Sequence, residues 1–210
     1  MLKILVADDH TIVREGLKQI LGEVPDMIVA GEASDGSEAL HKVRKDHYDL
    51  VLLDIAMPGI GGLDVLKQLK AEKPDLPVLM LSMYPEEQYA VRTLKAGASG
   101  YLTKESASDE LIAAIRKVSR GGKYVTSSLA EKLASCLDAN SDKPVHERLS
   151  DREYQVVRMI ASGKTVTEIA EDLSLSVKTI STNRSRALLK MGMKTNAELT
   201  YYAIKHGLVE

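Results

Sequence analysis

The stretch that decides the fold of the first part of the chain is residues 50–54, Leu50-Val51-Leu52-Leu53-Asp54. Four apolar residues follow one another, without the alternation of polar residues that a half-exposed strand would show. Such a run needs cover on both faces, which is the environment of a strand inside a parallel sheet. Because the run ends on Asp54, the stretch predicts both a buried strand and a carboxylate at its carboxyl end.

Short apolar runs of the same kind recur on both sides of this stretch and alternate with helical patterns. The other four strands are predicted at Lys3–Ala7, Met27–Ala30, Val78–Leu81 and Gly100–Leu102. Apolar residues at helical spacing predict helices at Thr11–Leu21, Glu38–Lys45, Leu63–Leu69, Glu86–Lys95 and Ser108–Ser119. Since helices that join parallel strands cover both faces of the sheet, we predict an α/β domain with a five-stranded parallel sheet.

Polar residues stand at the predicted strand ends. Asp8 and Asp9 close the first run, Asp54 closes the third, and Ser82 and Lys104 stand just past the fourth and fifth. Ligands bind outside the carboxyl ends of the strands of such a sheet, so we expect these side chains to converge. Converging carboxylates repel each other unless a cation lies between them, and oxygen ligands suit Mg²⁺. Asp54 can then act as a nucleophile towards a phosphoryl group, with Lys104 neutralising the transferred oxygens. The alternative for each acid taken alone is a helix N-cap.

The rest of the chain has a different pattern. A helical pattern at Ser128–Leu137 is followed by the polar stretch Asp138–Pro144, which we predict to be a linker. From Leu149 onward the pattern is helical throughout. It begins with a capping box, in which Ser150 and Glu153 each bond the other's backbone. These features predict a second, all-α domain.

Two short helices in this domain predict a helix-turn-helix. They are Thr167–Leu173 and Val177–Lys190, joined by the tight turn Ser174–Ser176. The residues expected to face the core from the second helix are Val177, Ile180, Ala187 and Leu188. The outward residues are Lys178, Ser181, Thr182, Arg184, Ser185 and Arg186. Cations that reach phosphates and short hydroxyls that reach base edges suit a helix in the major groove of DNA. The alternative is a surface helix of an ordinary bundle.

The composition is that of an ordinary globular chain, since 44% of the 210 residues are hydrophobic and 28% are charged. The single cysteine excludes an internal disulfide and fits a reducing cytosol. We see no signal-peptide core and no apolar run that could span a bilayer, so we expect a cytoplasmic protein with no membrane partner. The formal net charge is −2, yet Leu173–Ala197 holds five basic residues and no acidic one. That pattern is typical of a polyanion partner or of a solvated helix face.

The first domain resembles the receiver domain of bacterial two-component response regulators. The resemblance rests on Val6-Ala7-Asp8-Asp9-His10, Leu52-Leu53-Asp54-Ile55-Ala56-Met57-Pro58-Gly59, Ser82 and Tyr101-Leu102-Thr103-Lys104. It implies a flavodoxin-like sheet and a phosphoacceptor, Asp54, that receives its phosphoryl group from a sensor histidine kinase. It also implies the cofactor Mg²⁺, with Asp8, Asp9, Asp54 and the carbonyl of Ala56 as ligands. Lys104, Ser82 and Tyr101 would be the phosphoryl-stabilising and switch residues. Many receivers have proline where this chain has Glu105, so no cis peptide is expected there.

The second domain resembles the four-helix DNA-binding domain of LuxR/NarL-type regulators. The resemblance rests on Leu149–Glu153, Ala161–Lys164, Glu168–Ala170, Lys178–Ile180, Lys190–Met193 and Glu198–Leu208. It implies that double-stranded promoter DNA is a partner. The candidate contacts are then Lys178, Thr179, Ser181, Thr182, Arg184, Ser185, Arg186 and Lys190. Many members have Lys at the position of Ser181 and His at that of Asn183, so their base preference is not carried over.

The sequence favours a phosphorylated transcription regulator over an enzyme. A haloacid-dehalogenase-like phosphatase would need a second Asp two residues after Asp54, where this chain has Ala56. A third hypothesis, in which the C-terminal helices bind another protein, is separated from the first by a salt-sensitive DNA-binding assay. The predicted domains are a receiver at residues 1–122, a helical linker at 123–147 and a DNA-binding domain at 148–210.

Phosphorylation would add about −1.5 to −2 charges near the end of the sheet. We expect Ser82 to donate to a phosphoryl oxygen and Tyr101 to turn inward, which remodels the surface of the fourth and fifth helical stretches. Two outcomes stay open: a homodimer formed on activation, and release of the recognition helix from the receiver. RNA polymerase is a further candidate partner.

Overall fold

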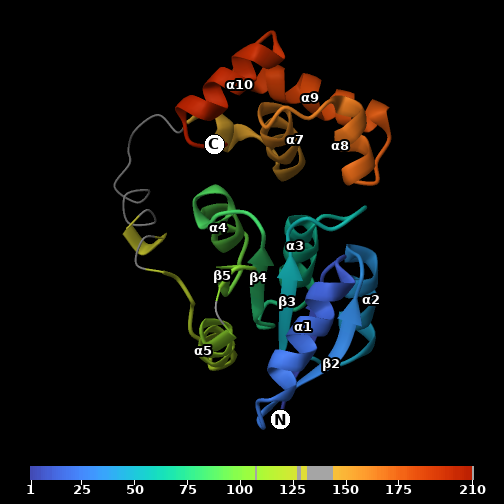
Figure 1. Ribbon diagram of the computed structural model, residues 1–210, viewed down its shortest axis with the longest axis vertical. Coiled ribbons are helices and arrows are strands. Elements are labelled where there is room, and N and C mark those ends of the chain that lie inside the picture. Colours follow the sequence, from blue (N-terminus) through green and yellow to red (C-terminus); the bar gives the residue numbers. More distant parts are fainter. Residues whose placement is uncertain (107, 127–128, 132–143, 210) are drawn as a thin grey trace. The chain divides into compact units, whose positions relative to one another are not determined.

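The computed structural model describes residues 1–106, 108–126, 129–131 and 144–209. The chain forms two compact units, Met1–Leu137 and Asp138–Glu210 (Figure 1). The helix expected at Ser128–Leu137 is described only at residues 129–131, which are helical, and the expected linker lies outside the described residues as far as Lys143. Among the described residues, no helix combines the length and apolar character needed to cross a membrane.

The first unit is built on a parallel sheet of five strands in the order β2-β1-β3-β4-β5. The strands are β1 Leu2–Ala7, β2 Met27–Ala33, β3 Leu50–Asp54, β4 Val78–Ser82 and β5 Gly100–Thr103. The predicted fold of this unit is therefore confirmed. The chain places β2 on one side of β1 and then places β3, β4 and β5 on the other side. The carboxyl ends of β1 and β3 therefore flank the crevice where such sheets bind ligands.

Strand ends differ from the sequence prediction where polar residues interrupt the apolar pattern. β2 continues past the predicted run because Gly31, Glu32 and Ala33 pair with the second half of β1. The apolar criterion missed this extension because Glu32 is charged. β3 and β4 each include one residue more than predicted, so Asp54 and Ser82 are themselves the last residues of their strands.

Helices cover both faces of this sheet. They are α1 Thr11–Gly22, α2 Gly36–Lys45, α3 Gly62–Glu72, α4 Glu86–Lys95 and α5 Ser108–Ser119. On one face α1 and α5 bury Leu17 and Ile115 in a cluster with Ile4 and Leu52 of the strands. Alternate strand residues such as Leu53 point to the opposite face of the sheet. They are also fully buried, because α2, α3 and α4 cover that face. The strands that end at Asp8 and Asp54 are thus buried on both faces of the sheet.

The second unit is helical throughout its described residues. A 3₁₀ turn at Val145–Arg148 precedes α7 Asp151–Ala161, α8 Val166–Asp172, α9 Val177–Met191 and α10 Asn196–Lys205. The buried cluster at its centre draws on three of these helices and consists of Val156, Ile160, Ile169, Ala170, Leu173 and Ile180. The turn between α8 and α9 contains Ser174 at a φ of 52°. The predicted helix-turn-helix is confirmed.

One predicted core position in this unit is wrong. Val177 is 47% exposed, whereas Ile180, Ala187 and Leu188 are buried as expected. Val177 is the first residue of α9, and helical side chains lean towards the N-terminus of their helix. Its side chain therefore extends beyond the packed turns into solvent. Met191, in the last turn of the same helix, is buried instead.

Candidate functional site

Four side chains that could hold a metal ion meet at the carboxyl ends of β1 and β3. Asp8, Asp9 and His10 follow β1, Asp54 ends β3, and one ligand atom from each lies within 4.8 Å of the others. Asp8 and Asp54 are buried, whereas Asp9 and His10 are exposed. The structure thus brings together the three acids that the sequence places at separate strand ends. His10, which was not a predicted ligand, joins them because its Nδ1 lies 2.7 Å from Oδ1 of Asp9.

Lys104 lies between the two buried carboxylates. Its Nζ is 2.7 Å from Oδ2 of Asp8 and 3.0 Å from Oδ2 of Asp54. Burial raises the pKa of Asp54 above its usual value, against the opposing attraction of Lys104. Burial acts to lower the pKa of Lys104, but the two carboxylates outweigh it and raise that pKa. Together with Asp9, these groups carry a net negative charge that favours a bound cation.

The loop after β3 is held close to Asp54. The Ile55 N–H donates to Oδ1 of Asp54 at 2.7 Å, and the Gly62 N–H donates to the Ile55 carbonyl at 3.0 Å. A Cβ at Gly62 would lie 1.8 Å from the backbone oxygen of Asp54, so only glycine lets α3 begin this close to the strand. This loop carries Ala56, which is half-buried. With Oδ1 of Asp54 engaged by the backbone, Oδ2 is the oxygen that faces Lys104.

Ser82 and Tyr101, the two predicted switch residues, both bond to the loop between β4 and α4. Ser82 is fully buried, and its Oγ accepts a hydrogen bond from the Tyr84 N–H at 3.1 Å. Tyr101 is 1% exposed, and its hydroxyl donates to the Tyr84 carbonyl at 2.6 Å. The Ser82 carbonyl also accepts from the Lys104 N–H at 2.8 Å. The inward position expected for Tyr101 after phosphorylation is therefore the one it already has here.

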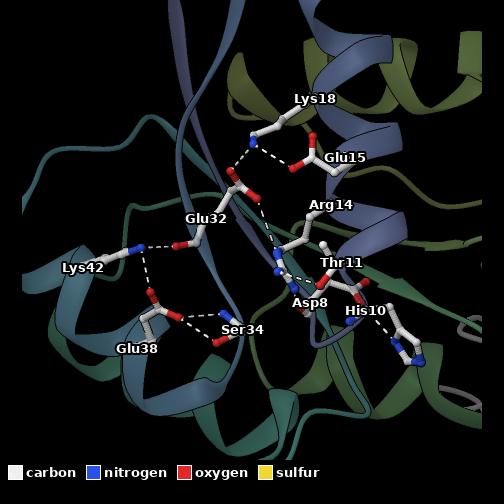
Figure 2. Close-up of polar contacts among 10 residues, drawn as sticks. All are labelled: Asp8, His10, Thr11, Arg14, Glu15, Lys18, Glu32, Ser34, Glu38 and Lys42. Carbon is white, nitrogen blue, oxygen red and sulfur yellow. Dashed lines mark hydrogen bonds and ion pairs between the residues drawn. The ribbon is translucent and has the colours of Figure 1, made fainter.

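A network of charges supports the Asp8 side of the site, and sequence reasoning missed it (Figure 2). Arg14 donates from Nη1 to the Asp8 carbonyl at 2.7 Å, and its Nε lies 3.4 Å from Glu32 of β2. Lys18 pairs with Glu32 at 2.5 Å, and Lys42 donates to the Glu32 carbonyl. These residues become neighbours only through the pairing of β2 with β1. Arg14 thereby fixes the backbone that carries two of the acids.

The outward face of α9 is the candidate nucleic-acid interface. Its exposed residues are Lys178, Thr179, Ser181, Thr182, Ser185 and Arg186. Arg184 is half-buried, and its Nε donates to Oδ1 of Asn196 at 2.5 Å. Ser176 caps the helix as predicted, because its Oγ accepts from the Thr179 N–H at 3.0 Å. α9 contains no acidic residue, so no carboxylate of this helix offsets the positive charge of its cations.

Lys190 differs from the other predicted DNA contacts, because its ammonium pairs with a buried acid. Its Nζ lies 2.6 Å from Oε2 of Glu153, which is 3% exposed. The same oxygen accepts from the Ser150 N–H at 2.8 Å, which completes the predicted capping box of α7. Burial acts to raise the pKa of Glu153, but Lys190 and Ser150 outweigh it and hold that pKa below its usual value. Lys190 therefore ties the end of α9 to the start of α7.

Removing the Glu153 carboxylate is expected to destabilise the second unit. Glu153→Ala loses a helix cap and hydrogen bonds to a charged group, together about 2–4 kcal/mol. Because the pKa of Glu153 is lowered in the folded chain, this stabilisation is present above the usual Glu pKa and disappears as the pH falls through the folded-state pKa. Amide hydrogen exchange in α7 and α9 measures the effect at neutral pH. Protection equal to that of the exposed control Glu171→Ala would contradict it.

Comparison with known proteins extends over both units. Residues 4–116 match the response regulator receiver domain, and residues 147–203 match the bacterial regulatory proteins of the luxR family. Response regulator UvrY of Escherichia coli K12 is 38% identical over 209 residues, which cover 99% of this chain and 96% of UvrY. Response regulator GacA of Pseudomonas aeruginosa is 37% identical over 212 residues, which cover 100% of this chain and 99% of GacA.

Solved structures show the same pair of domains. RcsB from Salmonella enterica serovar Typhimurium, bound to promoter rprA in the presence of phosphomimetic BeF₃⁻, matches with a TM-score of 0.66 and 29% identity. That match covers 96% of this chain and 97% of the RcsB chain. The acidic strand ends lie in the receiver match, and α9 lies in the luxR-family match. This chain therefore belongs to the LuxR-type response regulators, in which a receiver domain precedes a luxR-family regulatory domain.

Proposed function

We propose that this chain regulates transcription by binding promoter DNA under the control of phosphorylation at Asp54. The observation that carries the proposal is the Lys104 ammonium, 2.7 Å from Asp8 and 3.0 Å from Asp54 at the ends of two parallel strands. This arrangement pairs an acid that can attack a phosphoryl group with a fixed cation for the oxygens of that group. The match to RcsB on promoter DNA supports the DNA-binding part.

The acidic pocket fits a hard divalent cation. Asp8, Asp9 and Asp54 offer carboxylate oxygens. Together with the Ala56 carbonyl and retained waters they would form the oxygen ligand set that Mg²⁺ prefers. Bound Mg²⁺ would neutralise the acids and the phosphoryl oxygens. His10 offers a nitrogen, which suits Mg²⁺ poorly, so we assign it no role as a metal ligand.

We propose that Asp9, the exposed acid, is the most direct metal ligand of the acidic pair, since Lys104 pairs with Asp8 and Asp54. Loss of a second-shell partner already costs about tenfold or more in metal affinity, so Asp9→Ala is expected to weaken Mg²⁺ binding by more than about tenfold. Calorimetric titration of the full chain with Mg²⁺ measures the affinity. Glu72→Ala is the matched control, because Glu72 pairs with Arg44 away from the strand ends. Equal affinities of the two variants would remove the metal site. Removal of Mg²⁺ by a chelator should also stop phosphorylation by a small phosphodonor.

Phosphorylation would act through the loop between β4 and α4. Ser82 Oγ, which accepts from Tyr84 in this structure, would turn to donate to a phosphoryl oxygen. The Tyr101 hydroxyl donates to the carbonyl of the same Tyr84. The inward position of Tyr101 and the phosphorylated state would therefore both favour the same conformation of this loop. Such a switch shifts a pre-existing equilibrium. It would change the surface of α4 and α5, and with it dimerisation or the release of α9.

On the DNA side, we propose that Lys178, Arg184 and Arg186 contact phosphates. The residues that would approach base edges are Ser181, Thr182 and Ser185, with Thr179 beside them in the first turn. Substitution of one of these hydroxyl residues should change the preferred sequence by about 1–3 kcal/mol per lost base contact. Lys190 would contribute mainly by holding α9 in place through Glu153.

The proposed domains are a receiver at residues 1–122, a linker at 123–147 and a DNA-binding domain at 148–210. The family matches at residues 4–116 and 147–203 support this division. A sensor histidine kinase would supply the phosphoryl group, and the partners after activation would be promoter DNA, a second copy of the chain and RNA polymerase. A regulator of this kind works in the cytoplasm, where its own chemistry would be limited to gaining and losing the phosphoryl group.

A further inference from the structure

We infer that Asn196 is a positioning residue for DNA binding, which orients the guanidinium of Arg184 on the α9 face. The inference rests on the proposed DNA contacts of α9 and adds a residue from a different helix. Asn196 is the first residue of α10 and stands twelve positions after Arg184 in the chain. It was not among the residues that the sequence singled out.

The hydrogen bond between the two side chains fixes the plane of the guanidinium. Oδ1 of Asn196 accepts from Nε of Arg184 at 2.5 Å. Nε is the inner nitrogen of the group, so this bond leaves Nη1 and Nη2, the pair that grips a phosphate or a guanine edge, for a ligand. Within the described part of the chain, these two outer nitrogens have no acceptor.

The backbone that carries Asn196 is itself held in place. Thr195 Oγ1 accepts from the Glu198 N–H at 3.2 Å, and the Lys194 N–H donates to Oε2 of Glu198 at 2.8 Å. These bonds cap α10 at Thr195, the residue immediately before Asn196. The amide is therefore presented to Arg184 by a fixed helix start and not by a loose loop.

The connection between α9 and α10 is equally tight. Gly192 takes a φ of 68°, a left-handed conformation that glycine adopts without strain, and the Met193 N–H returns to the Leu188 carbonyl at 2.9 Å. The turn brings the start of α10 back beside the middle of α9. Asn196 consequently reaches Arg184 with a side chain of only two rotatable bonds.

The chemistry of the amide suits this role. Asn accepts the hydrogen bond without cancelling the positive charge of Arg184, so the guanidinium is ordered and still attracts phosphate. An aspartate at the same place would hold the guanidinium but neutralise it. Ordering a long side chain on binding costs about two- to tenfold in affinity, and Asn196 removes that cost before DNA arrives.

The test compares Asn196→Ala, Asn196→Asp and Arg184→Ala in the full chain, with fluorescently labelled duplex DNA of mixed sequence as the probe. Binding is measured over a range of salt concentrations. Asn196→Ala should weaken binding about two- to tenfold with an unchanged salt slope, because the charge remains and only its order is lost. Asn196→Asp should lower the salt slope by about one unit, as Arg184→Ala does. Combining Asn196→Ala with Arg184→Ala should cost no more than Arg184→Ala alone.

If Asn196 only stabilised α10, its variants would change DNA binding in a different way. Thr200→Ala, four residues further along α10, is the control for general effects on that helix. Full additivity of Asn196→Ala with Arg184→Ala, or wild-type affinity of Asn196→Ala, would overturn the inference while the proposed interface stands. Wild-type binding by Arg184→Ala would instead overturn the proposed contact of Arg184, and the role of Asn196 with it.

Discussion

Asp54→Ala is expected to abolish covalent phosphorylation of the chain by a small phosphodonor in the presence of Mg²⁺. Asp54 ends β3, its Oδ2 faces Lys104 at 3.0 Å, and its carboxylate is the group that the strand end presents to the pocket. Intact-mass measurement before and after incubation with the donor reports the adduct directly.

The control for this variant is Asp75→Ala, an exposed aspartate that precedes β4 and so lies at the opposite end of the strands. It should be phosphorylated as fully as the wild type. A phosphoryl adduct of similar yield on Asp54→Ala would show that another residue accepts the group.

Replacing Lys178, Arg184 and Arg186 together with Ala is expected to remove most of the affinity for duplex DNA. Each lost phosphate contact lowers the slope of log affinity against log salt by about 0.9, so the triple variant should lose about three units of slope. The loss should be nearly the same on every sequence, because phosphates carry no base information.

Lys205→Ala removes one exposed cation from the end of α10 and is the control for a general change of charge. Its slope should stay close to that of the wild type. A triple variant with an unchanged salt slope would mean that α9 does not lie against the DNA backbone.

The sequence predicts the receiver sheet and its acidic site well, because both follow from rules that act along the chain. An unbroken apolar run such as Leu50–Leu53 can only be a buried strand or a buried helix segment, and its short length favours the strand. Since parallel strands share one carboxyl end, Asp8, Asp9 and Asp54 had to meet. The capping box of Ser150 and Glu153 was predictable for the same reason, since it is local.

Contacts between residues far apart in the chain could not be predicted in this way. The pairing of Arg14 with Glu32 depends on the register of β2 against β1, which the charged end of β2 conceals. The bonds of Lys190 to Glu153 and of Arg184 to Asn196 depend on how α9 packs against α7 and α10. The last two contacts give a second role to Lys190 and Arg184, which the sequence describes only as candidate DNA contacts.

The most direct test of the account links the two domains in one measurement. The duplex with the highest affinity is first selected from random DNA, and its dissociation constant for the full chain is then measured with and without a phosphodonor and Mg²⁺. We expect the donor to change the affinity of the wild type and to leave that of Asp54→Ala unchanged. An equal response of both proteins to the donor, or no response of a fully phosphorylated wild type, would contradict it.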